Sequence, residues 1–566
     1  MQPDRPLPGL LGLVAVVLLA VALWDDHFLL HVLSTPVAYA QFRGTATQRQ
    51  RCQQRQQGRE QQRGERRKLP KRILTTGDPV STDADQGKAP LCAQWGCQCG
   101  RQSSSYPYSS SADYHKRHSA VKMLAAWRAK AKQPPPEVHQ DPSHCGYRTR
   151  AKLAVGPASR NAPAGASVVG LFRKGTFKVV SNSGCAVNHP VLAAAIVELQ
   201  AVLDDLRGAV KPYDHEIPAT RVVRKPSLRY VEMTVERASG LVQLVIVWNG
   251  GPECRPPALY ELIDRLWPRE GEQPLPARWH SIWVHWRKPE RKLQKAIESK
   301  SPDAWQQVRP DGGSLDVVEK LDGLPFAFGP ASFQQGNLGA FERILSDMKS
   351  ALHGLKLHST ERRLHLLELC AGVGVIGLSL AHAASTWQDS CGVSLLSTDW
   401  NPSGVGPFTS NARRIFPRLA AAGAVDAKFQ PWSIDEALRK LAQGAALGGR
   451  ADVLILDPPW RGLAQHHRPG EGDGGFVRGD VAARRIRQCE SLQAVIYMAC
   501  GHQSFMADAD RLTGRDPAAS GKGWGPPFQL VALNCYDMFP MTSHIEVLGV
   551  FVRSAPACAE DLLHKH

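Results

Sequence analysis

The second half of the chain alternates short apolar runs with segments of helical periodicity, and this alternation restricts the fold more than any other feature. The apolar runs cover residues 364–369, 395–399, 452–456 and 492–499. A helical pattern starts at Ile376, directly after the first run. Strands that alternate with helices build an open parallel sheet, which binds ligands beyond the carboxyl ends of its strands. We therefore predict an α/β fold, a Rossmann-like doubly wound domain, over residues 326–566.

The first apolar run ends in a glycine turn, Leu367-Glu368-Leu-Cys-Ala-Gly372-Val-Gly374. Glycines between a strand and a helix let the backbone approach a nucleotide-like ligand closely. The spacing is not that of the dinucleotide fingerprint, and a single Gly-x-Gly turn is as often an ordinary tight connection. The next run, however, ends at Asp399, whose carboxylate suits a ribose diol; the alternative is a cap for the helix that starts near Pro402. The glycine turn and Asp399, which follow two successive apolar runs, together favour a nucleotide pocket.

The third apolar run ends in Asp457-Pro-Pro-Trp-Arg-Gly462. Two prolines stiffen this loop and hold the carboxylate over the cleft. The same Asp-Pro-Pro-Trp sequence occurs in adenine-N6 methyltransferases, where the aromatic residue stacks on the base. That interpretation leaves Cys500 and Glu546 without a role.

Cys500 and Glu546 suit a transfer to carbon. Uracil C5 is a poor nucleophile, and it attacks a methyl sulfonium only after a thiolate has added to C6. A general base must then remove the C5 proton before the thiolate can leave. Cys500 follows the fourth apolar run, at the same sheet edge as Asp457, and we expect Glu546 at the turn of a hairpin between residues 528–531 and 547–552. Taken singly, Cys500 is also an ordinary buried thiol and Glu546 an ordinary solvated turn residue.

Residues 1–90 have the composition of targeting and linker segments. Residues 1–40 contain an apolar run, Leu7 to Trp24, which is long enough to cross a bilayer, and they end in a small-x-small pattern typical of a secretory cleavage site. Residues 41–90 are a basic, low-complexity segment and then a polar linker. Two interpretations stay open: a bipartite leader that directs the chain to a complex plastid, and a signal anchor that holds it in a membrane of the secretory pathway.

Residues 91–325 combine short β-rich runs with one amphipathic helix candidate, residues 190–206, which predicts an α+β domain. The formal net charge of +17 and the pI of about 9.4 suit a polyanion such as RNA, and they also suit anionic lipid. Nothing indicates an obligate protein partner, so we expect a monomer. Basic residues that either contact phosphates or form ordinary solvated surface are Arg148, Arg150, Lys152, Arg173, Lys174, Arg221, Arg224 and Lys225.

Together these residues resemble the RNA uracil-5-methyltransferase family, from about Leu91 to Arg553. The motifs in the family's order are Phe333-Gln-Gln335-Gly-Asn337, Glu368 to Gly374, Asp457-Pro-Pro, Tyr497-Met-Ala-Cys500 and Asp537 to Glu546. The resemblance implies a methyltransferase domain that uses S-adenosylmethionine, preceded by an RNA-binding domain, and a product of 5-methyluridine in ribosomal or transfer RNA. It assigns the nucleophile to Cys500 and the base to Glu546.

The resemblance also implies a cofactor site. The matching residues are Gln335, Cys370, Val375, Asp399, Ser433 and Asp457. The chain departs from the family at Cys370, which is usually aromatic, and at Val375, which is usually polar. Ala499-Cys500-Gly501-His502 stands where the family usually has Ser-Cys-Asn-Pro.

Thirteen cysteines in 566 residues are too dilute for a disulfide scaffold. Family members with an iron–sulfur cluster carry three clustered cysteines and a fourth further on, and Cys92, Cys97, Cys99 and Cys185 resemble that set. Four thiolates suit a [4Fe–4S] cluster or zinc equally well, and the tight Cys-x-Cys spacing leaves a degenerate site as the alternative. The resemblance implies that a cluster here would hold the RNA-binding domain and would not transfer electrons.

Three functions therefore remain at this point. The first is methylation of uracil C5 in RNA through a covalent adduct. The second is an adenine-N6 methyltransferase that uses the Asp-Pro-Pro-Trp loop. The third is a non-catalytic RNA-binding relative.

Overall fold

The computed structural model describes much of the chain between residues 118 and 553. The described ranges are 118–141, 145–159, 161–173, 176–214, 226–254, 256–267, 278–287, 304–310, 316–357, 361–417, 423–466, 476–477, 479–521, 523–540 and 544–553. All of them belong to the second of two compact units, residues 86–566. The expected leader and linker, residues 1–40 and 41–90, lie outside these ranges. Among the described helices, none combines the length and the apolar character needed to cross a bilayer.

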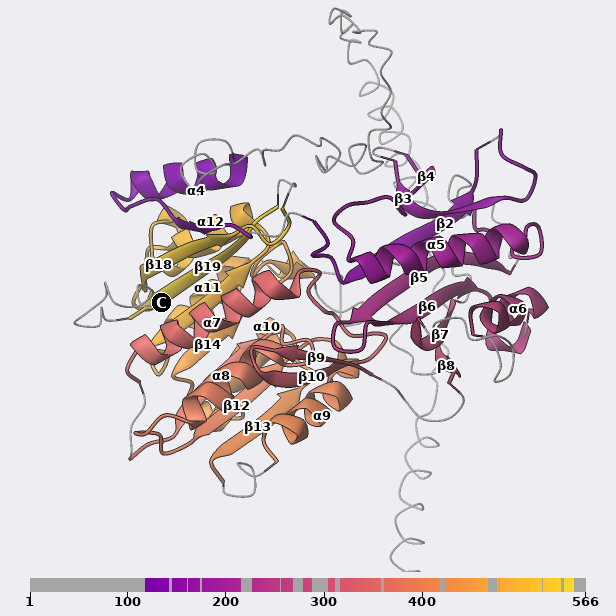
Figure 1. Cartoon of the computed structure of the whole chain (residues 1–566). Coiled ribbons are helices and arrows are strands. Elements are labelled where there is room, and N and C mark those ends of the chain that lie inside the picture. The colour runs from indigo at the N-terminus through magenta and orange to yellow at the C-terminus, as the bar shows by residue number, and fades with distance from the viewer. Residues whose placement is uncertain are drawn as a thin grey trace, which may run out of the picture. The chain divides into compact units, whose positions relative to one another are not determined.

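An eight-stranded sheet, which we call the catalytic sheet, forms the larger part of the described structure (Figure 1). Its strands, in spatial order, are β1 (Glu137–His139), β18 (Gln529–Tyr536), β19 (Glu546–Val552), β17 (Ala494–Ala499), β14 (Val453–Leu456), β11 (Leu364–Leu369), β12 (Val393–Thr398) and β13 (Val425–Gln430). From β17 to β13 all neighbours are parallel, whereas β19 runs antiparallel to β17 and to β18. The predicted parallel α/β sheet is confirmed, with one reversed strand added.

Helices cover both faces of the catalytic sheet, because its central strands are apolar on both sides. Leu366 and Ile455 face one core, and Leu367 and Leu454 face the other. The first core takes α7 (Leu338–Gly354), α8 (Val375–Ser385) and α9 (Val405–Ile415). The second takes α4 (Ser119–Lys130), α10 (Ile434–Ala442), α11 (Gly479–Gln488) and α12 (His502–Leu512). The sheet is therefore doubly wound, as predicted.

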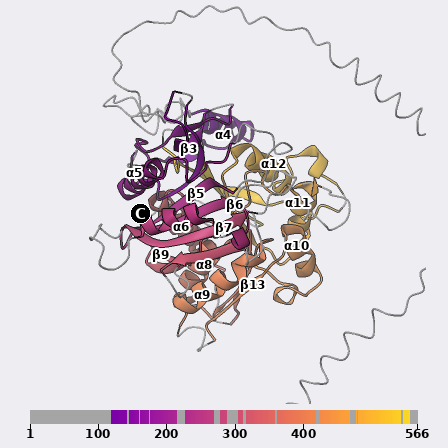
Figure 2. The ribbon, with the colours of Figure 1, turned by 90° about the vertical axis from the view of Figure 1, so that its right-hand side faces the viewer.

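Figure 2 shows strands of a second sheet, which we call the central sheet. This sheet has seven strands and its own apolar core. Its strands, in spatial order, are β4 (Val179–Ser181), β3 (Ser167–Phe172), β2 (Arg150–Pro157), β5 (Ser227–Glu236), β6 (Leu241–Asn249), β7 (Trp279–Arg287) and β8 (Trp305–Arg309). Helices α5 (Pro190–Asp205) and α6 (Pro257–Leu266) pack on one face. The α+β character and the helix predicted at residues 190–206 agree with this arrangement.

Shorter elements connect these parts. They are the hairpin β9 (Val317–Leu321) and β10 (Leu324–Phe328), the pair β15 (Gln465–His466) and β16 (Phe476–Val477), and the 3-10 helices η2 (Pro252–Cys254), η4 (Pro402–Gly404), η5 (Leu447–Gly449) and η6 (Pro517–Ala519).

The segment that carries α4 and β1 joins the catalytic sheet, although the sequence groups it with residues 91–325. β1 pairs in parallel with β18, and Trp127 Nε1 donates to Asp510 Oδ1 at 3.0 Å. Three residues are too few to show the two-residue period of a strand, so the sequence gives no sign of this pairing. The predicted domain 91–325 therefore includes a segment, residues 119–139, that packs with the catalytic sheet.

The central sheet contacts the catalytic part through the stretch that precedes α7. Thr149 N donates to Gly336 O at 3.0 Å, and Arg150 Nη1 donates to Ser332 O at 2.5 Å. Asn337 caps α7 by accepting from Ala340 N, and its amide donates to Met538 O at 3.1 Å. One short stretch is thus held by both parts of the molecule.

Candidate active site

The chain turns from β11 into α8 with backbone angles that favour glycine. Gly372 and Gly374 have φ values of +57° and +85°, in the left-handed region. A Cβ atom on Gly374 would lie 2.4 Å from the ring of Phe408, so a side chain does not fit there without displacement. Cys370 adopts the same region, with φ of +63°, although it is not glycine. The turn lines a pocket with its backbone.

Asp399 connects this turn to the end of β12. Its Oδ2 atom accepts from Gly372 N at 3.1 Å, and its Oδ1 atom accepts from Asn401 N at 2.9 Å. The cap of the 3-10 helix at residues 402–404 is Asn401, which accepts from Ser403 N at 3.2 Å. Asn401, and not Asp399, therefore caps this helix. A carboxylate is an acceptor with about four lone-pair sites, which is the chemistry that the hydroxyl groups of a ribose require.

Glu368, the last residue but one of β11, also lines the pocket, although the sequence pattern shows it only as part of the glycine-turn motif. Its side chain is buried, and it accepts from Gly377 N at 2.8 Å and from Ser397 Oγ at 2.5 Å. Burial raises its pKa to about 7, and the two hydrogen bonds only partly offset that rise. The sequence signal is an acidic residue inside an apolar strand, which needs buried partners.

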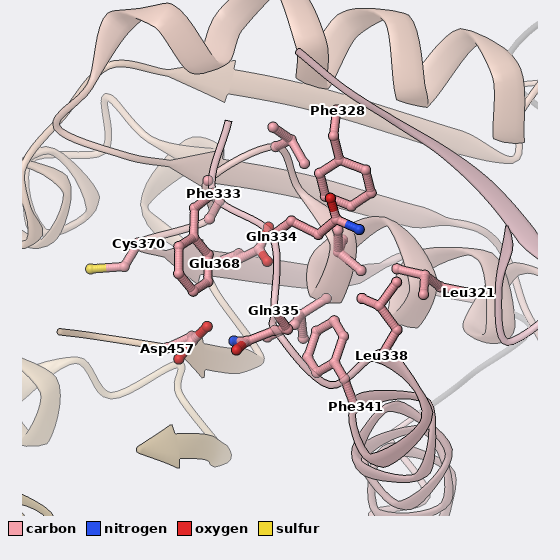
Figure 3. A pocket seen from close by; sticks show the side chains of 15 residues that line it. Leu321, Phe328, Phe333, Gln334, Gln335, Leu338, Phe341, Glu368, Cys370 and Asp457 are labelled. Atoms are coloured by element: carbon pink, nitrogen blue, oxygen red, sulfur yellow. The ribbon is translucent and has the colours of Figure 1, made fainter. Parts of the chain in front are cut away.

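A pocket opens between the glycine turn, the start of α7 and the loop after β14 (Figure 3). The side chains of Gln335, Glu368 and Asp457 reach into it beside Phe333 and Cys370. The predicted cofactor residues that line the pocket are Gln335, Cys370, Val375 and Asp457, and Asp399 borders it through Gly372. A mixture of apolar walls and a few polar groups is typical of a small-molecule site.

Ser433 lies outside this pocket lining. It follows β13 and caps α10, where its Oγ atom accepts from Glu436 N at 3.3 Å. The structure therefore gives Ser433 a structural contact.

Asp457 and Cys500 leave the same edge of the catalytic sheet, as predicted. β14 and β17 are parallel neighbours with Leu456 opposite Tyr497, and the two residues follow these strands. Tyr497 OH donates to Asp508 Oδ2 at 2.8 Å, and Leu463 N, in the loop after Asp457, donates to the same oxygen at 2.8 Å. The loop and the strand are thus fixed to each other by a buried carboxylate.

The thiol of Cys500 is exposed, in contrast to the alternative of an ordinary buried thiol. Its surroundings nevertheless raise its pKa to about 12, through partial loss of hydration and then through the charges of Glu546 and Asp457. The structure therefore brings these three predicted residues within electrostatic reach of one another. The free protein holds Cys500 as a neutral thiol at neutral pH.

Glu546 is the first residue of β19 and pairs with Tyr536, so the expected position at a turn is wrong. The side chain is only 3% exposed, and its Oε2 atom is buried without a hydrogen-bond partner. Burial and the nearby charge of Asp457 raise its pKa well above the ordinary value. The strand begins earlier than the apolar pattern indicates because a buried carboxylate interrupts that pattern.

Of the four predicted cluster ligands, only Cys185 falls in the described ranges; Cys92, Cys97 and Cys99 lie outside them. Cys185 is buried and packs with Tyr147 and Val187, next to Phe539. Burial raises its pKa, and Cys145 lies near enough to add to that rise. Within the described part of the chain, no three His, Cys, Asp or Glu residues are grouped to hold a metal ion.

The basic residues predicted to contact phosphates have different surroundings in the structure. Arg150 forms an ion pair with Glu232 and donates to Ser332 O, so it joins parts of the protein. Lys152 and Arg173 are exposed. Arg148 is half-buried, and its backbone forms isolated β-bridges with Asn188 and Asn337. Lys174, Arg221, Arg224 and Lys225 lie outside the described ranges.

Comparison with known proteins gives relatives and a structural neighbour but no match to a family model. The chain is 29% identical over 418 residues to an uncharacterized RNA methyltransferase of Protochlamydia amoebophila, covering 74% of this chain and 88% of that protein. It is 28% identical over 246 residues to the 23S rRNA (uracil(1939)-C(5))-methyltransferase RlmD of Alkalilimnicola ehrlichii, covering 44% of each. Among solved structures, it is similar to the Pyrococcus abyssi tRNA (uracil-54, C5)-methyltransferase in complex with S-adenosyl-L-homocysteine, with a TM-score of 0.48, 18% identity, and coverage of 85% of this chain and 92% of that one.

Proposed function

We propose that this protein methylates carbon C5 of uridine in RNA, with S-adenosylmethionine as methyl donor, and so produces 5-methyluridine. The observation that carries the proposal is the meeting of Cys500, Glu546 and Asp457 at the edge of the catalytic sheet, next to the pocket. RNA as the substrate class agrees with the two relatives, which are named as RNA methyltransferases. The basic charge of the chain favours the same polyanion.

S-adenosylmethionine fits the groups that surround the pocket. Asp399 offers carboxylate oxygens for a ribose diol, and the glycine turn lets the ligand approach the backbone. Gln335, Cys370, Val375 and Asp457 would line the rest of the site. When bound, S-adenosylmethionine supplies an electrophilic methyl group on a sulfonium.

Cys500 acts as the nucleophile. Its thiol releases its proton to solvent, which reaches the exposed residue. Sγ then bonds to C6 of the uracil, which moves the electron pair of the C5–C6 double bond toward C5. Because the pKa of Cys500 is about 12 in the free protein, the thiolate forms only as the substrate changes its surroundings. Keeping the thiol neutral until then protects it from side reactions.

Glu546 acts as the general base. After C5 has taken the methyl group, Glu546 accepts the C5 proton, the double bond re-forms and the bond from C6 to sulfur breaks. Its Oε2 atom is buried and has no partner in the structure, so it can accept that proton. A raised pKa makes the carboxylate a stronger base than an exposed glutamate.

We also propose that Cys92, Cys97, Cys99 and Cys185 bind a [4Fe–4S] cluster. The proposal rests on the resemblance of these four cysteines to the family's cluster ligands; Cys185, the one of them in the described ranges, is buried with Tyr147 and Val187. Iron and acid-labile sulfide in protein purified without oxygen test this proposal, and zinc alone would contradict it.

The experiment for the main proposal identifies the methylated nucleoside. Ribosomal and transfer RNA are incubated with the protein and labelled S-adenosylmethionine, and the nucleosides are analysed by mass spectrometry. We expect 5-methyluridine from the wild type and from Cys391→Ala, a control at an exposed cysteine, and none from Cys500→Ala. N6-methyladenosine, or full activity of Cys500→Ala, would support the adenine alternative, and RNA binding without any product would support the non-catalytic one.

A further inference from the structure

Trp460, in the loop after Asp457, carries a large exposed ring on a backbone that contacts the residue after the nucleophile. Its side chain is 66% exposed. Its carbonyl accepts from Ser504 Oγ at 2.7 Å, and Ser504 Oγ also lies 2.8 Å from the carbonyl of Gly501. A Cβ atom on Gly501 would lie 2.3 Å from Trp460 O, so the two backbones are in direct contact. The backbone of Trp460 is therefore fixed against the residue that follows Cys500.

The guanidinium of Arg461 lies over the Trp460 ring, 5.0 Å from its centroid, as in a cation–π contact. The large exposed fraction leaves the rest of the ring to solvent. An exposed indole on a fixed backbone, with a positive charge beside it, is suited to a stacked base whose phosphates lie near the arginine.

Other exposed aromatic side chains in the described part of the chain lie in different surroundings. Phe333 lines the cofactor pocket, Trp400 follows Asp399, and Phe177 belongs to the region of the central sheet. Trp460 is set apart from them by its backbone contact with the loop of Cys500.

We propose that Trp460 stacks on the nucleotide next to the target uridine, with Arg461 supporting the ring. This inference rests on the proposed function. A uridine that reaches Cys500 must leave its stack, and its neighbour then exposes an unpaired aromatic face. Trp460 is placed to cover that face while the target itself occupies the site of Cys500 and Glu546.

The test measures binding of a short single-stranded RNA that has one central uridine between cytidines. Fluorescence anisotropy gives the affinity for the wild type, Trp460→Ala, Trp460→Phe and Val197→Ala, the last being a control at an exposed apolar residue of α5. We expect Trp460→Ala to bind roughly tenfold more weakly, Trp460→Phe to recover most of the loss, and the control to bind like the wild type. S-adenosylmethionine affinity, measured by calorimetry, should stay the same in all four.

Abasic RNA separates stacking from a general structural effect. Removing the base on one side of the uridine should weaken binding to the wild type roughly tenfold and should not further weaken binding to Trp460→Ala. Equal losses in both proteins, or unchanged affinity of Trp460→Ala for the intact RNA, would overturn the inference. If the wild type binds RNA but forms no 5-methyluridine, the proposed function fails, and the affinities alone still decide whether Trp460 stacks.

Discussion

Asp508 accepts a hydrogen bond from the hydroxyl of Tyr497 at 2.8 Å, and this buried pair joins α12 to β17, the strand that directly precedes Cys500. The same Asp508 oxygen accepts from Leu463 N. Gly462 must lack a side chain, because a Cβ atom there would lie 2.2 Å from that oxygen. The Asp508 carboxylate therefore holds the loop that follows Asp457 against the strand that precedes Cys500.

Replacing Asp508 by alanine should damage both stability and turnover. The Tyr497 hydroxyl and the Leu463 amide would lose a buried acceptor, which costs about 1–3 kcal/mol for each unsatisfied group. Urea unfolding measures the loss of unfolding free energy, and the kcat of methyl transfer should fall while the KM for S-adenosylmethionine changes less. Asp426→Ala, at an exposed pair with Lys428, is the control and should cost less than about 0.5 kcal/mol. Equal effects of the two substitutions would contradict a special role of Asp508.

The thiol of Cys500 should react slowly with iodoacetamide at pH 8, despite its exposure. A pKa of about 12 leaves very little thiolate, so alkylation should be slower than that of an ordinary cysteine by on the order of a hundredfold. The exposed Cys391 serves as the internal reference. Glu546→Gln removes a negative charge that raises the pKa of Cys500, and it should therefore speed the reaction. Mass spectrometry of the two cysteine peptides measures both rates. A Cys500 that reacts as fast as Cys391 would show that its pKa is not raised.

Glu368 should make the protein less stable as the pH rises. Its pKa in the folded state is about 7, above the ordinary value of 4.5, so the folded state binds a proton that the unfolded state has released. The unfolding free energy therefore falls between about pH 4.5 and pH 7, by about 3 kcal/mol from this group, and changes little from it above pH 7. Urea unfolding across this range should show a smaller decline for Glu368→Gln. A parallel decline in the variant would assign the effect to other groups, such as Asp457 and Glu546.

Gly374→Ala should lower both the stability of the protein and its affinity for S-adenosylmethionine. A methyl group there would lie 2.4 Å from the Phe408 ring, and the backbone has φ of +85°, so we expect a loss of about 1–3 kcal/mol in stability and weaker binding of S-adenosylmethionine. Gly406→Ala, in α9, is the matched control because a Cβ atom meets no neighbour within 4 Å there. Calorimetry and thermal unfolding test both variants, and equal behaviour of the two would contradict the constraint at Gly374.

Local patterns predicted much of the fold. The strand at residues 364–369 and the start of the following helix agree with β11 and α8 to within one residue, because their apolar pattern and glycine turn are local signals. The short strand β1 and the contact of Arg150 with Ser332 depend on pairing between distant segments, which no local period records.

The site was predicted in part for the same reason. Residues at strand ends, such as Asp399 and Asp457, follow from the topology of a parallel sheet. Glu546 was expected at a turn but is a buried residue of β19. The sequence alone does not distinguish a buried carboxylate from a solvated one. Asp508 gave no sequence signal at all, since its role depends on the Tyr497 hydroxyl behind the sheet edge.

The most direct test of the account is the capture of a covalent complex between Cys500 and RNA. Transcripts of ribosomal and transfer RNA made with 5-fluorouridine offer no C5 proton for Glu546 to remove, so the adduct should persist in the presence of S-adenosylmethionine. On denaturing gels the wild type and Cys391→Ala should form the complex, and mass spectrometry should place the nucleotide on the Cys500 peptide. A complex formed equally by Cys500→Ala, or one attached to another residue, would contradict the account.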